Sequence, residues 1–390
     1  MKGIYLSNVD PQSSVGYMSK VLGQVRGFIN LGCDMDLICF DRNSRVTLTS
    51  SLKEDNRLLT PRVLYRSNKN LLIRRFNLLK AATEHILQSK PEFLYVRYPR
   101  SDPLYLSFLA NIRNRVPALI ILSEFPTYPY DKEYEATSCR KDRLVFFLDK
   151  ATRSCLKYFI NQAISINYGA SIFGMNTISI TNGINISDYE PVGRKPASLN
   201  TINIIGVANV NSWHGYDRVI SGLGEYYRNS SGSDRKITFH IVGARFPYLK
   251  ELLTLASKEG VTHAVVFHEP QQGRFLDLIF MNCHLAIGVL GGHRKDLYVM
   301  SPLKNREYCA RGIPFVFSHT DPDFSSDFEY CLQLKSDESP LNIEELISFA
   351  TDVYSKSDCV VEMRNYSRRF LDWSVKLQPV YTYLIEKNDS

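Results

Sequence analysis

The stretch Ser301–Phe317 combines the residue types of a helix start, a charged helix face, a helix end and a buried strand. Its first two residues, Ser and Pro, suit the start of a helix, Gly312 suits its end, and an apolar run of buried-strand type follows. A helix N-terminus presents unpaired N–H groups, which favour a bound phosphate. Lys304 and Glu307 lie three residues apart on one helical face, so they offer a cation for phosphate and a carboxylate for sugar hydroxyls. An ordinary capped helix with a surface ion pair would show the same pattern.

Length and composition set the class of protein in which this helix could act. With 390 residues, the chain has room for two domains. A net charge of +7 permits acidic substrates or contact with an anionic membrane surface and establishes neither. The 8 cysteines are scattered without a Cys-x-x-Cys pair, which favours a reducing compartment over disulfides or a zinc site. No apolar run approaches the roughly 18 residues of a membrane span. We therefore expect a soluble, cytoplasmic protein that does not bind nucleic acid.

Strand-like and helix-like segments alternate along the chain in two series. The first begins with a strand at 2–7, a loop at 8–16, a helix at 17–31 and a strand at 35–40, which is the opening of a doubly wound sheet. After a polar, linker-like segment at 191–198, the alternation restarts with a strand at 202–207. This pattern predicts two Rossmann-like α/β domains.

Loops at the carboxyl ends of the predicted strands are where ligands of such sheets collect. The loop Glu124–Asp131 is rich in tyrosine and carboxylate, and its Tyr128 and Tyr130 either stack on acceptor sugars or only line the loop. Gly16 at a helix mouth could let a ligand approach the backbone. The turn Gly291–Arg294 is flexible and cationic, so it could close on a diphosphate or be a polar surface turn.

Several motifs in order along the chain resemble those of GT-B fold glycosyltransferases of the large retaining group called family 4. Thr181–Asn185 is similar to the Asn-Gly-Ile-Asp segment that precedes the interdomain linker of that family, and Trp213–Ile220 is similar to its Lys-Gly-x-Asp-x-Leu-Ile segment. Ser301–Val316 resembles the Glu-bearing helix followed by Gly-x-Pro-x-Val. Leu94–Pro99 and Pro126–Asp131 resemble a bacterial subgroup of polysaccharide-assembly enzymes.

The resemblance implies a role for individual residues on the donor side. Glu307 takes the place of the carboxylate that holds the donor ribose, and the turn Ser301, Pro302, Leu303 faces the diphosphate with its backbone. His214, Gly215 and Asn209 stand where the family has Lys-Gly and a nearby Arg, while Val299 replaces the earlier glutamate of the helix motif. Arg294 and Lys304 are the candidates to supply the missing positive charge, with His293 beside them.

On the acceptor side, Glu124 lies where the family often has a histidine, which makes it a catalytic candidate. Arg97, Tyr128 and Tyr130 are the candidates for acceptor binding. The carboxylates near the proposed phosphate site are sparse, so we expect transfer without a metal ion or other cofactor.

The resulting prediction is transfer of a sugar from a nucleotide-diphosphate sugar to a hydroxyl of a glycan or lipid-linked acceptor, in cell-surface polysaccharide biosynthesis. The resemblance implies that the transfer retains the configuration of the sugar. The acceptor-side domain would comprise 1–188 plus about 365–390, with a C-terminal helix crossing back to it, and the donor-binding domain 189–364, across a cleft. Peripheral contact with the inner membrane surface stays open. A sugar-nucleotide 2-epimerase of the same fold and a non-catalytic nucleotide-sugar-binding subunit are the alternatives.

Overall fold

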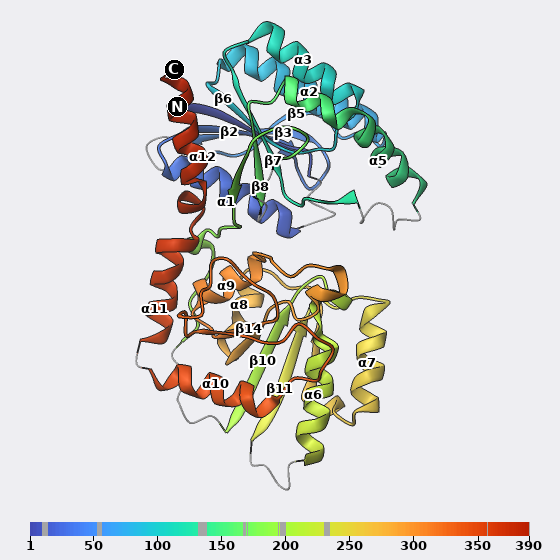
Figure 1. The fold of residues 1–390 in the computed structure, drawn as a ribbon, viewed down its shortest axis with the longest axis vertical. Coiled ribbons are helices and arrows are strands. Elements are labelled where there is room, and N and C mark those ends of the chain that lie inside the picture. The colour runs from blue at the N-terminus through green and yellow to red at the C-terminus, as the bar shows by residue number, and fades with distance from the viewer. Residues whose placement is uncertain are drawn as a thin grey trace. The chain divides into compact units, whose positions relative to one another are not determined.

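The computed structural model divides the chain into two compact α/β units (Figure 1). One comprises Met1–Gly183 with Trp373–Ser390, and the other comprises Ile184–Asp372. The structure describes residues 1–9, 15–52, 57–131, 139–166, 169, 171–193, 195, 200–229, 235–356 and 358–389. Residues 10–14 of the predicted loop, and 194 and 196–198 of the predicted linker, lie outside the described residues. The prediction of two Rossmann-like α/β domains is confirmed.

The first unit is built on one mixed sheet with strand order β4-β3-β2-β1-β6-β7-β8-β9, and β5 pairs with β3. Strands β1, β2 and β6 to β9 are parallel, whereas β3 to β5 form an antiparallel edge. Its elements are β1 (Lys2–Ser7), α1 (Val15–Asn30), β2 (Asp34–Phe40), β3 (Val46–Leu52), β4 (Arg57–Leu58), β5 (Arg62–Tyr65), α2 (Leu71–Ser89), β6 (Phe93–Arg97), α3 (Pro103–Arg115), β7 (Ile120–Phe125), α5 (Arg140–Thr152), the 3₁₀ turn η1 (Arg153–Tyr158), β8 (Gln162–Ile166), β9 (Thr177–Ile180) and α12 (Trp373–Asn388).

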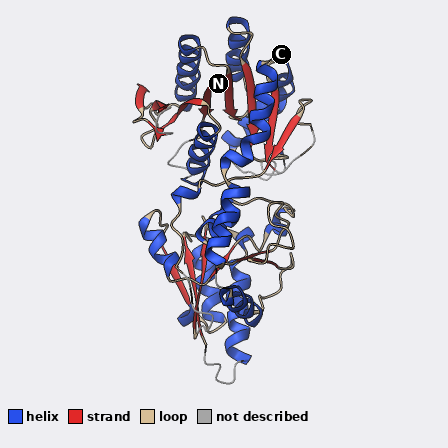
Figure 2. Ribbon diagram, turned by 90° about the vertical axis from the view of Figure 1, so that its left-hand side faces the viewer, coloured by secondary structure: helices blue, strands red, loops and turns tan. Residues whose placement is uncertain are grey.

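Helices cover both faces of this sheet, and alternate residues of the strands serve the two faces (Figure 2). In β6, Leu94 and Val96 belong to the core under α2 and α3. The intervening residues Phe93 and Tyr95 lie against Phe28 of α1, with ring centroids 5.5 and 5.3 Å apart. Arg97 continues this alternation, so its side chain lies on the α1 face.

The last helix of the chain, α12, packs on α1 of the first unit. A Cβ atom at Gly23 would lie 2.5 Å from the indole ring of Trp373, and one at Gly27 would lie 2.8 Å from its Cβ. Two glycines on one face of α1 therefore make room for Trp373, which is 2 % exposed. Pro379 lies inside α12.

The second unit has a parallel sheet of order β12-β11-β10-β13-β14-β15. This is the doubly wound order 3-2-1-4-5-6, in which the direction of winding reverses between β10 and β13. Its elements are η2 (Ile186–Asp188), β10 (Thr201–Val207), η3 (Ser212–His214), α6 (Tyr216–Asn229), β11 (Lys236–Val242), α7 (Tyr248–Lys258), η4 (Thr262–Ala264), β12 (Val265–His268), α8 (Arg274–Met281), β13 (Leu285–Ile287), η5 (Gly292–Lys295), α9 (Leu303–Arg311), β14 (Phe315–Phe317), β15 (Cys331–Gln333), α10 (Ile343–Ser355), α11 (Cys359–Tyr366) and the π turn η6 (Ser367–Leu371).

The differences from the sequence prediction concern short and polar elements. The antiparallel strands β3 to β5 and the strand β8 were not predicted, because their sequences mix polar and apolar residues without a long apolar run. Helix α9 begins at Leu303 with Pro302 as its N-cap, one residue later than expected. No helix among the described residues is long and apolar enough to cross a membrane.

Candidate functional site

In the second unit, the loops that follow β10 and β13 meet where the sheet reverses its winding. The N–H of Leu290 donates to the carbonyl of His214 at 3.1 Å, and that of Gly291 donates to the carbonyl of Trp213 at 3.1 Å. Gly215 adopts φ 67°, and a Cβ there would lie 2.7 Å from that of Leu290. Only glycine fits this contact, which brings together two loops at the usual ligand position of a doubly wound sheet.

Lys304, in the first turn of α9, reaches toward this junction. Its Nζ lies 3.3 Å from the hydroxyl of Tyr216, the residue after Gly215. Within the described ranges, no carboxylate lies within 4.0 Å of this ammonium group. Burial lowers the pKa of Lys304 to about 7, against the opposing effect of Glu307. A half-buried lysine without an acidic partner at a helix N-terminus is suited to bind an anion.

Glu307 lies one turn further along the same helix. Its Oε1 accepts from Nε of Arg311 at 2.9 Å, and Nη1 of Arg311 also pairs with Asp277 at 2.7 Å. Burial raises the pKa of Glu307, although Arg311 opposes the shift. The arrangement holds the carboxylate in place by one oxygen, so the other oxygen can accept from a ligand hydroxyl.

His214 and Asn209 occupy the loop after β10 as predicted from the order of the motifs. His214 is 8 % exposed, and its Nδ1 accepts from the backbone N–H of Asn211 at 3.0 Å. That bond requires the tautomer that carries its proton on Nε2, whereas donation from Nδ1 to the Asn211 carbonyl, 3.2 Å away, requires the other tautomer. Burial, helped by Lys304, lowers the pKa of His214 to about 2, so it is a neutral donor and not a cation. Asn209 is exposed, and its carbonyl accepts from the side chain of Asn211 at 3.1 Å.

The turn Gly291–Arg294 is held in place, which corrects the expectation of a flexible cationic loop. Nη1 and Nη2 of Arg294 donate to the carboxylate of Asp217 at 3.0 and 2.7 Å, and Arg294 also pairs with Glu338. His293 shares Glu338, with Nε2 at 2.7 Å from its Oε1. Two carboxylates thus neutralise Arg294, so it fixes this turn and does not supply free charge for a leaving group.

The predicted turn Ser301, Pro302, Leu303 does form the start of α9. Ser301 is 2 % exposed, and the N–H of Asn305 donates to the carbonyl of Pro302 at 3.2 Å. The N–H groups of this first turn have no acceptor within the helix, which is a general property of helix ends. Val299, next to this turn, is 51 % exposed.

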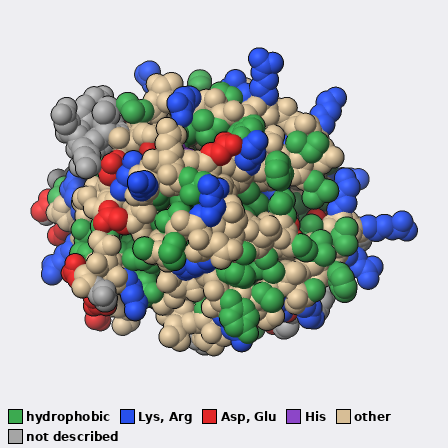
Figure 3. Space-filling view, turned by 90° about the horizontal axis from the view of Figure 1, so that it is seen from above, with side chains coloured by type: hydrophobic (Ala, Val, Ile, Leu, Met, Phe, Trp, Pro, Cys, Tyr) green, Lys and Arg blue, Asp and Glu red, His purple; other side chains and the backbone are tan. Residues whose placement is uncertain are grey.

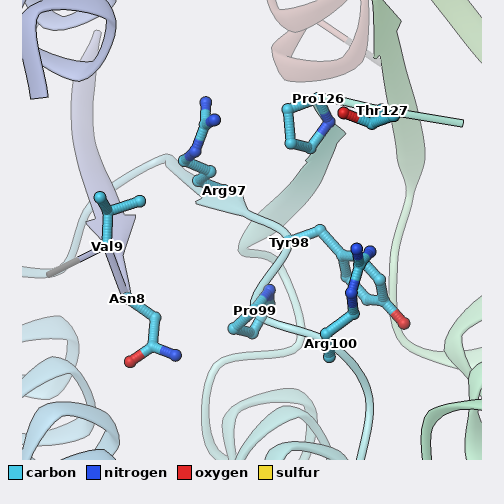
Figure 4. Close-up of a pocket in the computed structure, with 8 residues that line it drawn as sticks. All are labelled: Asn8, Val9, Arg97, Tyr98, Pro99, Arg100, Pro126 and Thr127. Carbon is cyan, nitrogen blue, oxygen red and sulfur yellow. The ribbon is translucent and has the colours of Figure 1, made fainter. Parts of the chain in front are cut away.

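In the first unit, a pocket of about 220 Å³ lies where the sheet reverses between β1 and β6 (Figure 4). Asn8 and Val9 line one side of it, and Pro126 and Thr127 line another, with the segment Arg97–Arg100 between them. These residues lie at or directly after the carboxyl ends of β1, β6 and β7, so this pocket also has the position expected for a ligand.

Glu124 and Arg97 pair across β6 and β7 on the α1 face of this sheet. They are register partners, and Nη1 of Arg97 lies 3.0 Å from Oε1 of Glu124. Nζ of Lys20 lies 2.9 Å from the same oxygen, while Tyr95 donates to Oε2 at 2.8 Å. Burial alone would raise the pKa of Glu124, but Lys20 and Arg97 outweigh it and hold the pKa at about 2.

This environment corrects the expectation that Glu124 is catalytic. The side chain is 0 % exposed, and both of its oxygens already accept hydrogen bonds. Glu124 therefore positions Lys20 and Arg97 and cannot touch a substrate. Arg97, by contrast, lines the pocket as well as the buried network.

The two tyrosines predicted to contact an acceptor differ in their placement. Tyr130 is 1 % exposed and donates to Asp149 at 2.6 Å, which corrects its assignment to acceptor binding. Tyr128 is half-buried, with its ring 6.2 Å from that of Tyr130. Gly16 is exposed within α1, and a Cβ there would meet no atom within 4 Å. Neither of these last two residues lines the pocket.

The described residues contain no cluster of three or more side chains that could hold a metal ion. Two Asp-x-Asp pairs occur in the sequence, at 34–36 and 321–323. Asp36 lies 2.7 Å from Nε2 of His85, and the second pair binds the buried Arg306. Both pairs thus have a structural partner.

Sequence reasoning missed the residues that surround the predicted ones. Lys20 was read as part of an apolar-faced helix, and Tyr216, Asp217 and Glu338 were not singled out at all. The two arginines that flank Tyr98-Pro99, directly after a buried strand, were the one available signal for the pocket of the first unit.

No family model matches this sequence, and no curated protein matches it either. Solved structures do match in fold. Sucrose-phosphate synthase from Thermosynechococcus elongatus aligns with a TM-score of 0.64 and 13% identity over 100% of both chains. AviGT4, a glycosyltransferase involved in avilamycin A biosynthesis, aligns at 0.55 and 10% over 100% of this chain and 99% of its own. WaaG, a glycosyltransferase involved in lipopolysaccharide biosynthesis, aligns at 0.54 and 11% over 99% of each chain.

These likenesses define the class: the chain has the two-domain GT-B fold, as predicted. Two of these neighbours, AviGT4 and WaaG, are glycosyltransferases. The more specific assignment, to family 4 and to polysaccharide assembly, stays a prediction.

Proposed function

We propose that this protein is a glycosyltransferase that binds a nucleotide-diphosphate sugar in its second unit and transfers the sugar to an acceptor hydroxyl. The observation that carries the proposal is Lys304, which lies at the mouth of α9 with no acidic partner among the described residues. Glu307 stands one turn away on the same helix. A nucleotide sugar would contact both side chains, with its diphosphate at Lys304 and the N-terminus of α9 and its ribose at Glu307.

In the proposed reaction, the bond from the sugar C1 to the diphosphate oxygen breaks and a bond from the acceptor oxygen to C1 forms. The acceptor proton leaves with the diphosphate. Negative charge grows on the departing diphosphate, so Lys304, Nε2–H of His214 and the N–H groups of the first turn of α9 would stabilise it most in the transition state. The resemblance described above implies attack on the face from which the diphosphate leaves, with retention of configuration.

The carboxylates near this site form ion pairs with arginines: Asp217 with Arg294 and Asp277 with Arg311. Since positive charge comes from the protein, we propose that transfer needs no divalent metal. Chelation with EDTA should leave the rate of nucleoside diphosphate release unchanged. Loss of the rate with EDTA, and its return with magnesium, would show that the diphosphate binds elsewhere.

The acceptor side would belong to the first unit, and the acceptor would be a glycan or a lipid-linked glycan. Helices α2 and α5 of this unit expose large apolar side chains, among them Leu72 at 71% and Phe147 at 68%. Exposed basic residues lie at the N-terminal ends of these two helices, namely Lys69 just before α2 and Arg140 and Lys141 in the first turn of α5. Figure 3 shows hydrophobic side chains lying among projecting lysines and arginines on the face it views. Such a surface suits peripheral contact with an anionic membrane.

Vesicle sedimentation tests this contact. The protein should sediment with vesicles that contain phosphatidylglycerol and stay in solution with phosphatidylcholine alone. Leu72→Glu and Phe147→Glu should reduce the bound fraction several-fold, whereas Phe275→Glu, at a residue of the second unit that is 72% exposed, should not. Equal losses in all three variants would contradict a specific membrane face.

A panel of UDP-, GDP- and other nucleotide sugars tests the main proposal. Binding is measured by calorimetry and turnover by release of nucleoside diphosphate. We expect one nucleotide class to bind and to compete with its own nucleoside diphosphate. Absence of binding across the panel would contradict the proposal.

A further inference from the structure

The pocket of the first unit opens onto a buried group of charges that does not sum to zero. Lys20, Arg97 and Glu124 are 4, 5 and 0 % exposed, so two cations share one carboxylate away from bulk water. A buried charge without a counterion is costly, and proteins normally pair it. The described residues of this group thus carry one excess positive charge.

Arg97 belongs both to this buried group of charges and to the lining of the pocket. Glu124 accepts from Arg97 through Nη1 alone, so the carboxylate does not span the guanidinium fork. The remaining oxygen of Glu124 takes the hydroxyl of Tyr95 and the amide of Gln24. Of Lys20, Arg97 and Glu124, Arg97 is the one that lines the pocket, so a ligand there meets the network at this residue (Figure 4).

The walls of the pocket extend this positive and polar character. Arg100 lines it, with its guanidinium carbon 3.7 Å from the ring centroid of Tyr130. The amide of Asn8 and the hydroxyl of Thr127 lie on opposite sides of the two arginines (Figure 4). None of the described residues that line this pocket is acidic. Planar guanidinium groups match the oxygens of a phosphate.

We infer that this pocket binds a phosphate group of the acceptor, which makes the acceptor of the proposed transfer an anionic one. The identification of the ligand as the acceptor rests on the proposed function, but the anion site itself is independent of the second unit. A volume of about 220 Å³ is smaller than the roughly 300 Å³ at which pockets for whole drug-sized ligands begin. The pocket therefore takes one charged group and leaves the rest of the ligand outside.

Calorimetric titration with glycerol phosphate tests the site without knowledge of the acceptor. The wild type, Arg97→Gln, Arg100→Gln, Lys304→Met and the control Lys258→Met, at an exposed lysine in the last turn of α7, are compared at fixed ionic strength. We expect affinity to fall about tenfold or more in each arginine variant, because each removes a charge-assisted contact, and to stay unchanged in Lys258→Met. Arg100 lies outside the buried network, so its variant keeps the test valid if Arg97→Gln does not fold.

A second arm separates a soluble phosphate from a lipid headgroup. Vesicles of phosphatidylcholine with and without phosphatidic acid replace glycerol phosphate. The affinity for vesicles that contain phosphatidic acid is divided by the affinity for vesicles that lack it, and this ratio is compared between the wild type and Arg100→Gln. Arginine-dependent binding of either ligand supports the inference and shows whether the phosphate belongs to a soluble molecule or to a lipid headgroup.

Binding of both ligands that is unaffected by the arginine variants, or no binding at all, would overturn the inference. If Lys304→Met alone abolished glycerol phosphate binding, the phosphate would belong to the second unit. Loss of nucleotide-sugar binding in Lys304→Met is a separate result, so the two proposals can fail independently.

Discussion

Nζ of Lys304 lies 3.3 Å from the hydroxyl of Tyr216, which joins the first turn of α9 to the glycine turn after β10. This contact holds a cation at the point where the second sheet reverses its winding. A neutral hydroxyl does not cancel the charge, so the site can still attract an anion. The proposed donor site depends on this relationship.

Lys304→Met should weaken binding of the nucleotide-sugar donor by roughly ten- to a hundredfold, the value of one charge-assisted hydrogen bond of about 1.5–3 kcal/mol. Titration calorimetry measures the change. Lys258→Met, at an exposed lysine in the last turn of α7, is the matched control and should bind like the wild type. Equal affinity in both variants would remove Lys304 from the site.

Donor affinity should fall as pH rises through neutrality. The pKa of Lys304 is lowered to about 7 in the free protein, so the ammonium form predominates below pH 7 and is lost above it. A bound diphosphate would raise that pKa, so binding above pH 7 must take up a proton. The dissociation constant should therefore increase between pH 6 and 8.5 in the wild type and stay flat in Lys304→Met. A profile of the same slope in both proteins would assign the dependence to another group.

Glu307→Gln should weaken donor binding by about ten- to a hundredfold, because a neutral amide accepts a ribose hydroxyl less strongly than a carboxylate. Arg311 keeps its pair with Asp277 at 2.7 Å, so the helix should stay folded. Glu251→Gln on α7 is the exposed control. A donor lacking both ribose hydroxyls should bind the wild type and Glu307→Gln alike; if it still discriminates between them, the carboxylate contacts some other part of the donor.

Glu124→Gln should destabilise the first unit by about 3–5 kcal/mol, because it leaves Lys20 and Arg97 buried without their counterion. Denaturant unfolding measures the free energy. The double variant Lys20→Met with Glu124→Gln removes one of the two cations and should recover part of the loss. Full stability of the single variant would mean that water or an anion already compensates for the two cations.

Trp373→Ala should destabilise the first unit by about 3–5 kcal/mol, the usual cost of removing a buried aromatic side chain. Gly23 and Gly27 of α1 leave a space that only the indole fills, so hydrogen exchange in α1 should accelerate. Val375→Ala, at a residue that is 40% exposed on the same helix, should change stability little. Faster exchange confined to the second unit would contradict the assignment of α12 to the first.

The sequence was informative where the relevant residues are close in the chain. Lys304 and Glu307 share one helix, so their spacing alone put them on one face. The alternation of strands and helices likewise predicted the two α/β units. Partners set by tertiary contacts could not be predicted: Arg97 and Glu124 are register partners on neighbouring strands, and Arg294 meets Glu338 from another loop. Both contacts changed a predicted role, because each neutralised a charge that the sequence left apparently free.

The most direct test of the central claim is to incubate the protein with the donor that binds best, with and without an extract of cell-surface glycans and lipids, and to identify the nucleotide product. We predict that nucleoside diphosphate is released at a rate that rises strongly with the extract and falls in Lys304→Met. Conversion of the donor into an isomeric nucleotide sugar without any acceptor, or tight binding with no release, would contradict a glycosyltransferase.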